Sequence, residues 1–229
     1  MMHRGPSAST TFGSTAGDCG QGREAEAAVL RRHSEGLRAT PVAVPGCPTS
    51  ATTVVTVERH LEWHDCSNVR DLGGLPTLDG HMTRRRAVSR ADSLDRLTRD
   101  GWGALEEYGV RTIIDLRNDV EREAEPYTCG LSVVHVPIED DTDGEFIELW
   151  RPFSTPHYYG AALERWPERT VAAVREVARA GPGGVVVHCG RGRDRTGLVA
   201  VLLLALAGVH PDDILWAVRE RMVQTALRT

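Results

Sequence analysis

The chain has 229 residues, of which 41% are hydrophobic, and a formal net charge of −5 at pH 7. This length and apolar content predict one folded domain with some additional chain. The negative balance does not favour nucleic acid as a partner, and we expect none. Five scattered cysteines without paired spacing indicate neither a disulfide framework nor a zinc site, so no metal or other cofactor is expected.

Composition also bears on location and on domain boundaries. The start of the chain lacks the apolar run of a signal peptide, and the longest apolar run, 198–209, is shorter than the ~20 residues that cross a bilayer. We therefore expect a cytoplasmic protein with no membrane span. Residues 1–50 are rich in Gly, Pro, Ser, Thr and Ala, which predicts a mostly disordered leader and leaves 51–229 for the folded domain.

The first predicted elements of that domain are two strands, a turn and a helix. β-Branched residues predict a strand over 53–57, and a second strand is expected over 59–63. Asn and paired Gly within 67–74 indicate a turn. A helix is predicted from Thr98, whose hydroxyl would cap it, to the glycine at position 109 that ends it.

The remaining chain alternates strands with helices. Further strands are predicted over 111–117, 133–138 and 185–188, and an acidic loop over 139–144. Helices are predicted over 156–180, after 197 and from Pro211. The apolar faces expected for the first and last of these helices are Leu163, Val171, Val174 and Val177, and Ile214, Leu215, Val218 and Met222. This alternation predicts an α/β fold with a central, mostly parallel twisted sheet flanked by helices.

The most informative stretch is the loop between the strand over 185–188 and the helix after it. Five residues lie between Cys189 and Arg195 in this loop. A loop at a helix N-terminus directs unpaired N–H groups at whatever lies in front of it, so it binds a phosphate dianion and favours the thiolate form of a cysteine. The guanidinium of Arg195 matches two phosphate oxygens, and Gly190 and Gly192 let a phosphate approach the main chain.

Two motifs carry a family resemblance. The string His-Cys-x-x-Gly-x-Asp-Arg-Thr-Gly, which begins at His188, resembles the signature loop of the cysteine-dependent protein tyrosine phosphatase superfamily, in its bacterial and fungal dual-specificity branch. The string Asn-x-Arg-Asp-Leu-Gly-Gly, which begins at Asn68, is similar to a second motif of that branch. The resemblance covers about 57–222. It implies an enzyme that hydrolyses phosphomonoesters through a phosphocysteine, with a phosphotyrosine protein or another phosphomonoester as its substrate.

The resemblance and the chemistry of the loop together suggest roles. Cys189 is the expected nucleophile, and Arg195 is expected to hold the phosphate oxygens through both steps. Thr196 is expected to assist departure of the sulfur. His188 is expected either to orient the loop or to pack as a core histidine at a strand end. The remaining phosphate-binding residues are expected to be Gly190, Arg191, Gly192 and Arg193.

The polar residues of the second motif leave two interpretations open. Asn68, Arg70 and Asp71 could act directly in catalysis, or they could form a buried network that fixes the turn, and the second is favoured. The arginines at 84–86 are interpreted as a solvated face, whereas Arg90 could line the approach of the phosphate.

The general acid is less clearly marked, because the Trp-Pro-Asp setting of many relatives is absent. Asp140, Asp141 and Asp143 follow a predicted strand, where they could act as the acid or form a solvated turn. Asp194 lies in the cysteine loop itself and could serve as the acid or brace the loop.

Substrate class is partly open. The branch usually has Lys where Arg193 stands, and in the resemblance that Lys accompanies tolerance of phosphoinositides. The sequence therefore predicts a protein tyrosine phosphatase that could show dual specificity, with a phosphoinositide phosphatase or a phosphate-binding pseudophosphatase as alternatives. A sulfurtransferase is disfavoured because its cysteine loop is shorter. A P-loop nucleotide hydrolase is excluded because no Gly-x4-Gly-Lys-Ser/Thr occurs.

Overall fold

The computed structural model describes residues 59–122, 130–150 and 157–226. The leader predicted over 1–50 and the strand predicted over 53–57 lie outside these residues. Within the described part of the chain, no helix is both long and apolar enough to cross a membrane.

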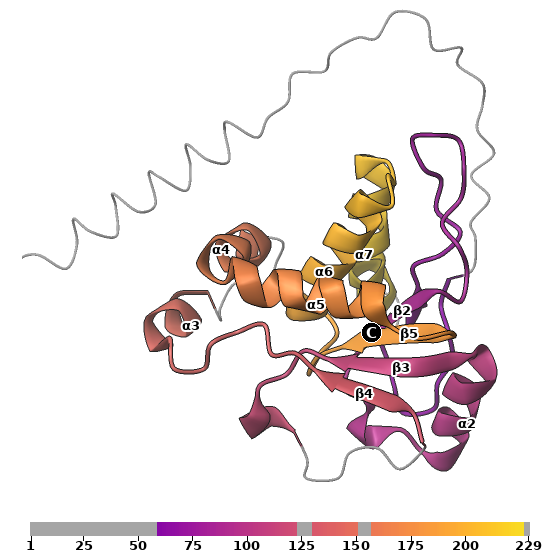
Figure 1. Cartoon of the computed structure of the whole chain (residues 1–229), viewed down its shortest axis with the longest axis horizontal. Helices are drawn as coiled ribbons and strands as arrows, with labels where there is room; N and C mark the ends of the chain where they lie inside the picture. The colour runs from indigo at the N-terminus through magenta and orange to yellow at the C-terminus, as the bar shows by residue number, and fades with distance from the viewer. Residues whose placement is uncertain (1–58, 123–129, 151–156, 227–229) are drawn as a thin grey trace, which may run out of the picture. The chain divides into compact units, whose positions relative to one another are not determined.

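A five-stranded sheet runs through the centre, in the order β1-β2-β5-β3-β4 (Figure 1). Its strands are β1 (Arg70–Asp71), β2 (Val88–Ala91), β3 (Val110–Asp115), β4 (Ser132–His135) and β5 (Gly184–His188). The short edge strand β1 pairs antiparallel with β2, and the other three pairings are parallel. The expected α/β fold with a mostly parallel sheet is confirmed.

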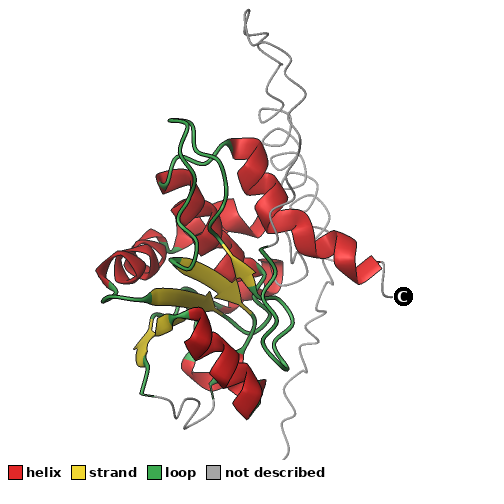
Figure 2. Ribbon diagram, turned by 90° about the vertical axis from the view of Figure 1, so that its right-hand side faces the viewer, coloured by secondary structure: helices red, strands yellow, loops and turns green. Residues whose placement is uncertain are grey.

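Helices cover both faces of this sheet (Figure 2). They are α2 (Arg99–Tyr108), α3 (Gly144–Trp150), α4 (His157–Arg165), α5 (Pro167–Arg179), α6 (Asp194–Leu206) and α7 (Pro211–Ala226), with 3-10 turns η1 (Leu94–Arg96) and η2 (Asp119–Glu121). Helix α2 lies on one face, and α5 and α6 lie on the other. The side chains of the central strands alternate accordingly: Ile113 packs in the cluster that contains Leu105 of α2, and Ile114 packs in the cluster that contains Val199 of α6.

The boundaries of α2 agree with the sequence signals. The hydroxyl of Thr98 accepts a hydrogen bond from the Gly101 amide at 3.2 Å, and Gly109 ends the helix in the left-handed conformation at φ 101°. Both caps satisfy backbone groups that a helix end would otherwise leave unpaired.

Two predicted elements are wrong. Residues 59–63 form no strand, because His60 and Trp63 make only isolated bridges. The helix predicted over 156–180 is two helices, α4 and α5, which are separated at Trp166 (φ −131°, ψ 57°). Pro167 explains the break: its ring disfavours a helical conformation in the residue before it, and proline itself suits the first turn of a new helix.

The expected apolar faces are also partly wrong. Val171 and Leu215 are 48% and 49% exposed. The buried positions are Thr170 and Ala173 in α5 and Ile214 and Ala217 in α7. Met222 lies outside the described side chains. The periodicity of apolar residues thus predicted the helices, but which residues of each helix are buried depends on the elements packed against it.

Candidate active site

Parallel pairing brings the carboxyl ends of β2, β3 and β5 to one edge of the sheet, where ligands commonly bind in open α/β folds. Cys189 follows β5 directly, and α6 begins five residues later at Asp194. The Cys189 side chain is only 2% exposed, and it lies at the base of a cavity of about 1100 Å³. Cys189 is therefore a nearly buried residue of the cavity lining, just before the N-terminus of α6.

Gly192 allows the loop to pass close to the end of β2. Its φ is +62°, and a Cβ at this position would lie 2.4 Å from the Ala91 carbonyl oxygen. An L side chain would meet both a conformational penalty and a backbone contact, so the path of the loop requires glycine here.

Side chains from earlier in the chain hold the loop carbonyls. Asn68 Nδ2 donates to the Gly192 carbonyl at 2.8 Å and to the Arg191 carbonyl at 3.3 Å. Arg90 Nη2 donates to the Gly192 carbonyl at 2.5 Å, and the Ser93 amide donates to the Gly190 carbonyl at 3.2 Å. In a trans peptide the carbonyl and the N–H of the following residue point in opposite directions. Because the loop carbonyls point toward Asn68 and Arg90, the N–H groups that follow them point away from these side chains.

The second motif is itself fixed by buried carboxylates. Asp71 accepts hydrogen bonds from the Gly73 amide at 2.8 Å and the Arg86 amide at 3.1 Å. Asp92 accepts hydrogen bonds from Cys66 Sγ at 2.7 Å and from the Ser67 amide at 3.0 Å. The contacts of this segment are those of a scaffold for the loop. Arg90 belongs to that scaffold, since it is buried against the Gly192 carbonyl.

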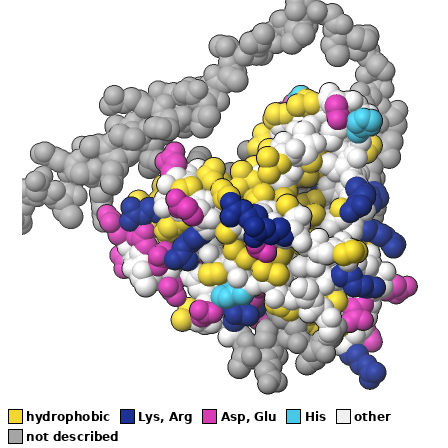
Figure 3. Space-filling view, in the orientation of Figure 1, with side chains coloured by type: hydrophobic (Ala, Val, Ile, Leu, Met, Phe, Trp, Pro, Cys, Tyr) yellow, Lys and Arg dark blue, Asp and Glu magenta, His cyan; other side chains and the backbone are white. Residues whose placement is uncertain are grey.

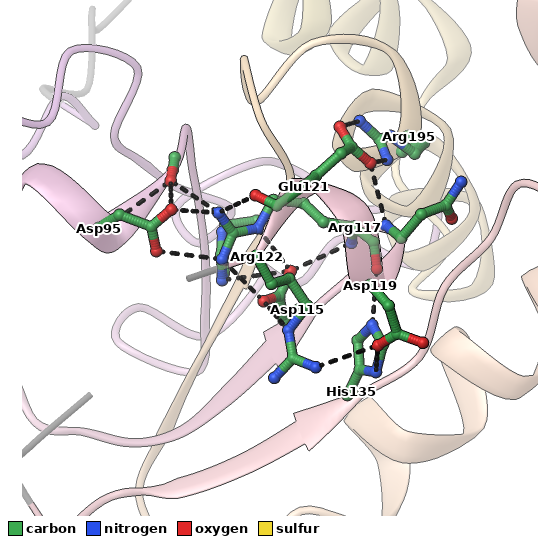
Figure 4. A network of polar contacts seen from close by, with 11 residues as sticks. Asp95, Asp115, Arg117, Asp119, Glu121, Arg122, His135 and Arg195 are labelled. Carbon is green, nitrogen blue, oxygen red and sulfur yellow. Dashed lines mark hydrogen bonds and ion pairs between the residues drawn. The ribbon is translucent and has the colours of Figure 1, made fainter. Parts of the chain in front are cut away.

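Arg195 meets two carboxylates that sequence reasoning missed, Glu121 and Glu139. Figure 4 shows the contact with Glu121. Its Nη2 donates to Glu121 Oε1 at 2.7 Å, its Nη1 donates to Glu121 Oε2, and Glu139 Oε2 lies 3.4 Å from Nη1. Burial alone would lower the pKa of the guanidinium, but the Glu121 hydrogen bonds and the negative charges of Cys189, Glu139 and Glu121 outweigh it and raise the pKa above its usual range.

Glu121 is held in place by its own turn. In the capping box of η2, Glu121 Oε2 accepts from the Asn118 amide at 2.9 Å. The adjacent Arg117 is buried between Asp95 and Asp115, and its Nη1 also donates to the Glu121 carbonyl at 3.3 Å. Burial would raise the pKa of the Glu121 carboxyl, but its hydrogen bonds with Arg195 lower it.

His188 and Thr196 are both fully buried. The His188 ring lies 3.7 Å from Asp115 Oδ1, and burial lowers the pKa of its imidazole to about 4 although Asp115 opposes the shift. The Thr196 hydroxyl has no hydrogen-bond partner among the described residues. Both residues adjoin the loop ends, His188 at the end of β5 and Thr196 in the first turn of α6.

The candidates for the general acid separate into two groups. Asp140 pairs with Arg169 at 3.0 Å, and Asp143 pairs with Arg165 at 2.7 Å. Asp141 and Asp194 instead line the cavity beside Cys189. For Asp140, hydrogen bonds from Thr142 lower the pKa of the carboxyl, which does not suit a proton donor at neutral pH.

One wall of the cavity carries apolar side chains. It is lined by Val120, Phe146, Ile147, Trp150 and Tyr158, most of them from α3. Tyr158 donates a hydrogen bond to Glu139 Oε1 at 2.8 Å, and this contact holds the Glu139 carboxylate against the wall. The sequence signals for this wall were weak, because α3 is short and follows an acidic loop.

Comparisons with known proteins show the family of the chain. The sequence model of the tyrosine phosphatase family matches residues 61–216. The chain is 30% identical over 189 residues to a candidate tyrosine-protein phosphatase of Cupriavidus necator, covering 79% of this chain and 68% of that protein. It is 32% identical over 141 residues to a tyrosine-protein phosphatase of Nostoc commune, covering 56% of this chain and 46% of that protein.

Two solved structures are also similar in part. A mutant form of Tk-PTP is 22% identical, with a TM-score of 0.36 over 58% of this chain and 77% of that chain. A variant of human DUSP28 is 18% identical, with a TM-score of 0.35 over 59% of this chain and 77% of that chain.

A cysteine and an arginine on one strand–loop–helix, at the floor of a cavity at the carboxyl edge of a parallel sheet, together with the matched family model, define a hydrolase of phosphoric monoesters. Because the family model matches residues 61–216 of the 229, the chain belongs to the tyrosine phosphatase family.

Proposed function

We propose that this protein is a cytoplasmic protein tyrosine phosphatase that acts through a phosphocysteine intermediate and requires no metal ion. The observation that carries the proposal is the position of Cys189 at the base of a roughly 1100 Å³ cavity with Arg195 and Asp194 in its lining. A cavity of this size accommodates the phenyl phosphate of phosphotyrosine, and the apolar wall around Phe146 and Trp150 suits its ring.

In the first step, the Cys189 sulfur anion attacks phosphorus in line, and an S–P bond forms while the P–O bond to tyrosine breaks. The leaving oxygen takes a proton from Asp194, with Asp141 as the alternative donor, so that neutral tyrosine departs. Arg195 and the N–H groups of Gly190, Arg191, Gly192 and Arg193 stabilise the equatorial oxygens.

In the second step, water attacks the phosphocysteine and gives its proton to the carboxylate that acted as the acid. The S–P bond breaks, and inorganic phosphate and the Cys189 anion are released. The Thr196 hydroxyl, buried next to the loop, donates a hydrogen bond to the departing sulfur. His188 acts through the loop, since its buried imidazole lies at the end of β5 rather than in the cavity lining.

The test is a substrate panel of phosphotyrosine, phosphoserine and phosphothreonine peptides, para-nitrophenyl phosphate and phosphoinositides, with and without EDTA. We expect turnover of phosphotyrosine that EDTA leaves unchanged and that Cys189→Ser abolishes. The matched control is Cys66→Ser, because Cys66 is a buried thiol bound to Asp92 and lies outside the cavity lining.

Mass spectrometry of acid-quenched enzyme should find one phosphoryl group on Cys189. Activity that survives Cys189→Ser, or that disappears with EDTA, would refute the proposed mechanism. Binding of phosphotyrosine without turnover would instead indicate a pseudophosphatase, and turnover of phosphoinositides in place of phosphotyrosine would indicate a lipid phosphatase.

A further inference from the structure

The cavity above the cysteine loop is several times larger than a phosphate requires, so most of it is available to the rest of the substrate. Helix α3 and the loop before it form one side of it. This segment contributes apolar contacts through Phe146, Ile147 and Trp150, and it also contributes the carboxylates of Asp141 and Glu148. The charge and polarity of this side therefore determine which residues are favoured next to the phosphorylated residue of a substrate.

Three of the six acidic groups of this segment, residues 139–150, already have partners. Asp140 is paired with Arg169, Asp143 with Arg165, and Glu139 with Tyr158 and Arg195. Asp141 and Glu148 are exposed, line the cavity, and form no ion pair with any described residue. Two carboxylates of this segment are therefore left to meet a charge on a molecule that enters the cavity.

Basic groups are distributed differently. Among the described lining residues, the arginines are Arg191 and Arg195, and both belong to the cysteine loop and its helix, where the phosphate would bind. Figure 3 shows acidic side chains gathered at the left edge of the molecule, the side on which Figure 1 draws α3. The lining arginines thus lie at the phosphate end of the cavity, and the unpaired carboxylates of Asp141 and Glu148 lie on α3 and the loop before it.

We propose that this cavity selects phosphotyrosine segments that carry Lys or Arg beside the phosphotyrosine, with Glu148 as the specificity-determining residue and Asp141 supporting it. This inference rests on the proposed function. A basic side chain next to the phosphotyrosine would form an ion pair with Glu148, whereas acidic neighbours would be repelled. The further phosphates of a polyphosphoinositide headgroup would be repelled in the same way.

The experiment compares three phosphotyrosine peptides that differ only in having Arg, Ala or Glu on both sides of the phosphotyrosine. We expect kcat/KM for the Arg peptide to exceed that for the Glu peptide by about five- to twentyfold at low salt, as partly exposed charge pairs allow. The ratio should fall toward one at ~1 M salt, where the Debye length is about 3 Å.

The charge-reversing variant Glu148→Arg should invert the preference toward the Glu peptide. The matched control is Glu145→Arg. Glu145 is an exposed acid on the same helix, but it does not line the cavity, so this variant should keep the peptide preference of the wild type. Equal effects of the two variants would show that the net charge of the protein, not the cavity, sets the preference, and would overturn the inference.

Hydrolysis of para-nitrophenyl phosphate distinguishes failure of the specificity inference from failure of the proposed function, because this ester has no charged residues beside its phosphate. If the wild type hydrolyses this ester but treats the three peptides alike, or prefers the Glu peptide or a polyphosphoinositide, the specificity inference is wrong and the proposed function stands. If the wild type hydrolyses neither the ester nor the peptides, the proposed function itself fails.

Discussion

Glu121 forms a two-point ion pair with Arg195 beside Gly190 of the cysteine loop. A Cβ built on Gly190 would lie 3.6 Å from Glu121 Oε1 and 3.8 Å from Arg195 Nη2. The carboxylate therefore lies close to the loop and engages the same guanidinium that a substrate phosphate would use. In the proposed mechanism, the phosphate must share this arginine with Glu121 or displace it.

We expect Glu121→Gln to tighten the binding of inorganic phosphate several-fold. The amide removes a negative charge from the guanidinium that phosphate would bind, while its oxygen can still accept the Asn118 amide in the capping box. The measurement is the inhibition constant of phosphate against hydrolysis of para-nitrophenyl phosphate. Glu176→Gln, which removes a surface carboxylate paired with Arg179, is the control and should leave the constant unchanged. Weaker phosphate binding in Glu121→Gln would mean that the carboxylate positions Arg195 rather than competing for it.

Two glycine substitutions should separate backbone conformation from close packing. Gly192 and Gly208 both have positive φ, at 62° and 73°, but only Gly192 has a backbone atom near its missing Cβ. Gly208→Ala should lower the free energy of unfolding by about 1–2 kcal/mol, the cost of a side chain in the left-handed region. Gly192→Ala should cost roughly 3 kcal/mol or more, because the contact with the Ala91 carbonyl is added. Urea denaturation measures both, and equal losses would contradict the close approach of the loop to β2.

Removal of the Asn68 side chain should weaken the cysteine loop. Asn68→Ala leaves the buried Gly192 carbonyl with one donor fewer, which should lower the free energy of unfolding by about 1–3 kcal/mol. A displaced loop should also lower kcat about ten- to a hundredfold. Ser89→Ala is the matched control, since it removes a buried hydrogen bond to the Val185 carbonyl at 3.3 Å and should leave kcat unchanged. A normal kcat in Asn68→Ala would show that the loop keeps its shape without this contact.

The buried imidazole of His188 predicts a pH dependence of stability. Its pKa falls from 6.5 to about 4 on folding because burial disfavours the charged form. Between these values the unfolded chain binds more protons than the folded chain, so the free energy of unfolding must rise with pH. The contribution is complete above pH 6.5 and is lost as the pH falls toward 4, for a total of about 3 kcal/mol.

Urea denaturation between pH 5 and 7.5 tests this expectation. His81→Gln, an exposed position, should keep the wild-type slope, and His188→Gln should flatten it. NMR titration of the wild-type imidazole gives an independent measurement that does not require the variant to fold. A pKa near 6.5 for His188 would contradict the prediction.

Helix α2 shows what local sequence can determine. Its start at Thr98 and its end at Gly109 were predictable because both caps are made by residues adjacent to the helix. The single helix expected over 156–180 failed for a reason that is also local, since Pro167 interrupts a periodicity that otherwise continues through both α4 and α5. The exposure of Val171 and Leu215, by contrast, depends on which neighbours cover each helix and leaves no local signal.

The acidic loop gives the corresponding lesson for the site. Asp140, Asp141 and Asp143 were equivalent in the sequence as possible acids. Folding separated them, because Arg169 of α5 and Arg165 of α4 pair with two of them and leave Asp141 at the cavity. Arg169 is 29 residues from Asp140 and Arg165 is 22 residues from Asp143, so their pairing could not be deduced from spacing.

The sequence by itself determined the cysteine loop, because strand, glycines, cysteine, arginine and helix start are contiguous and their chemistry depends on neighbours in the chain. Only the tertiary structure decided what surrounds that loop. Glu121 meets Arg195 across 74 residues, and Asn68 reaches the Gly192 carbonyl across 124. Such contacts form when packed elements bring distant residues together, and no local pattern of residue types records which partners will meet.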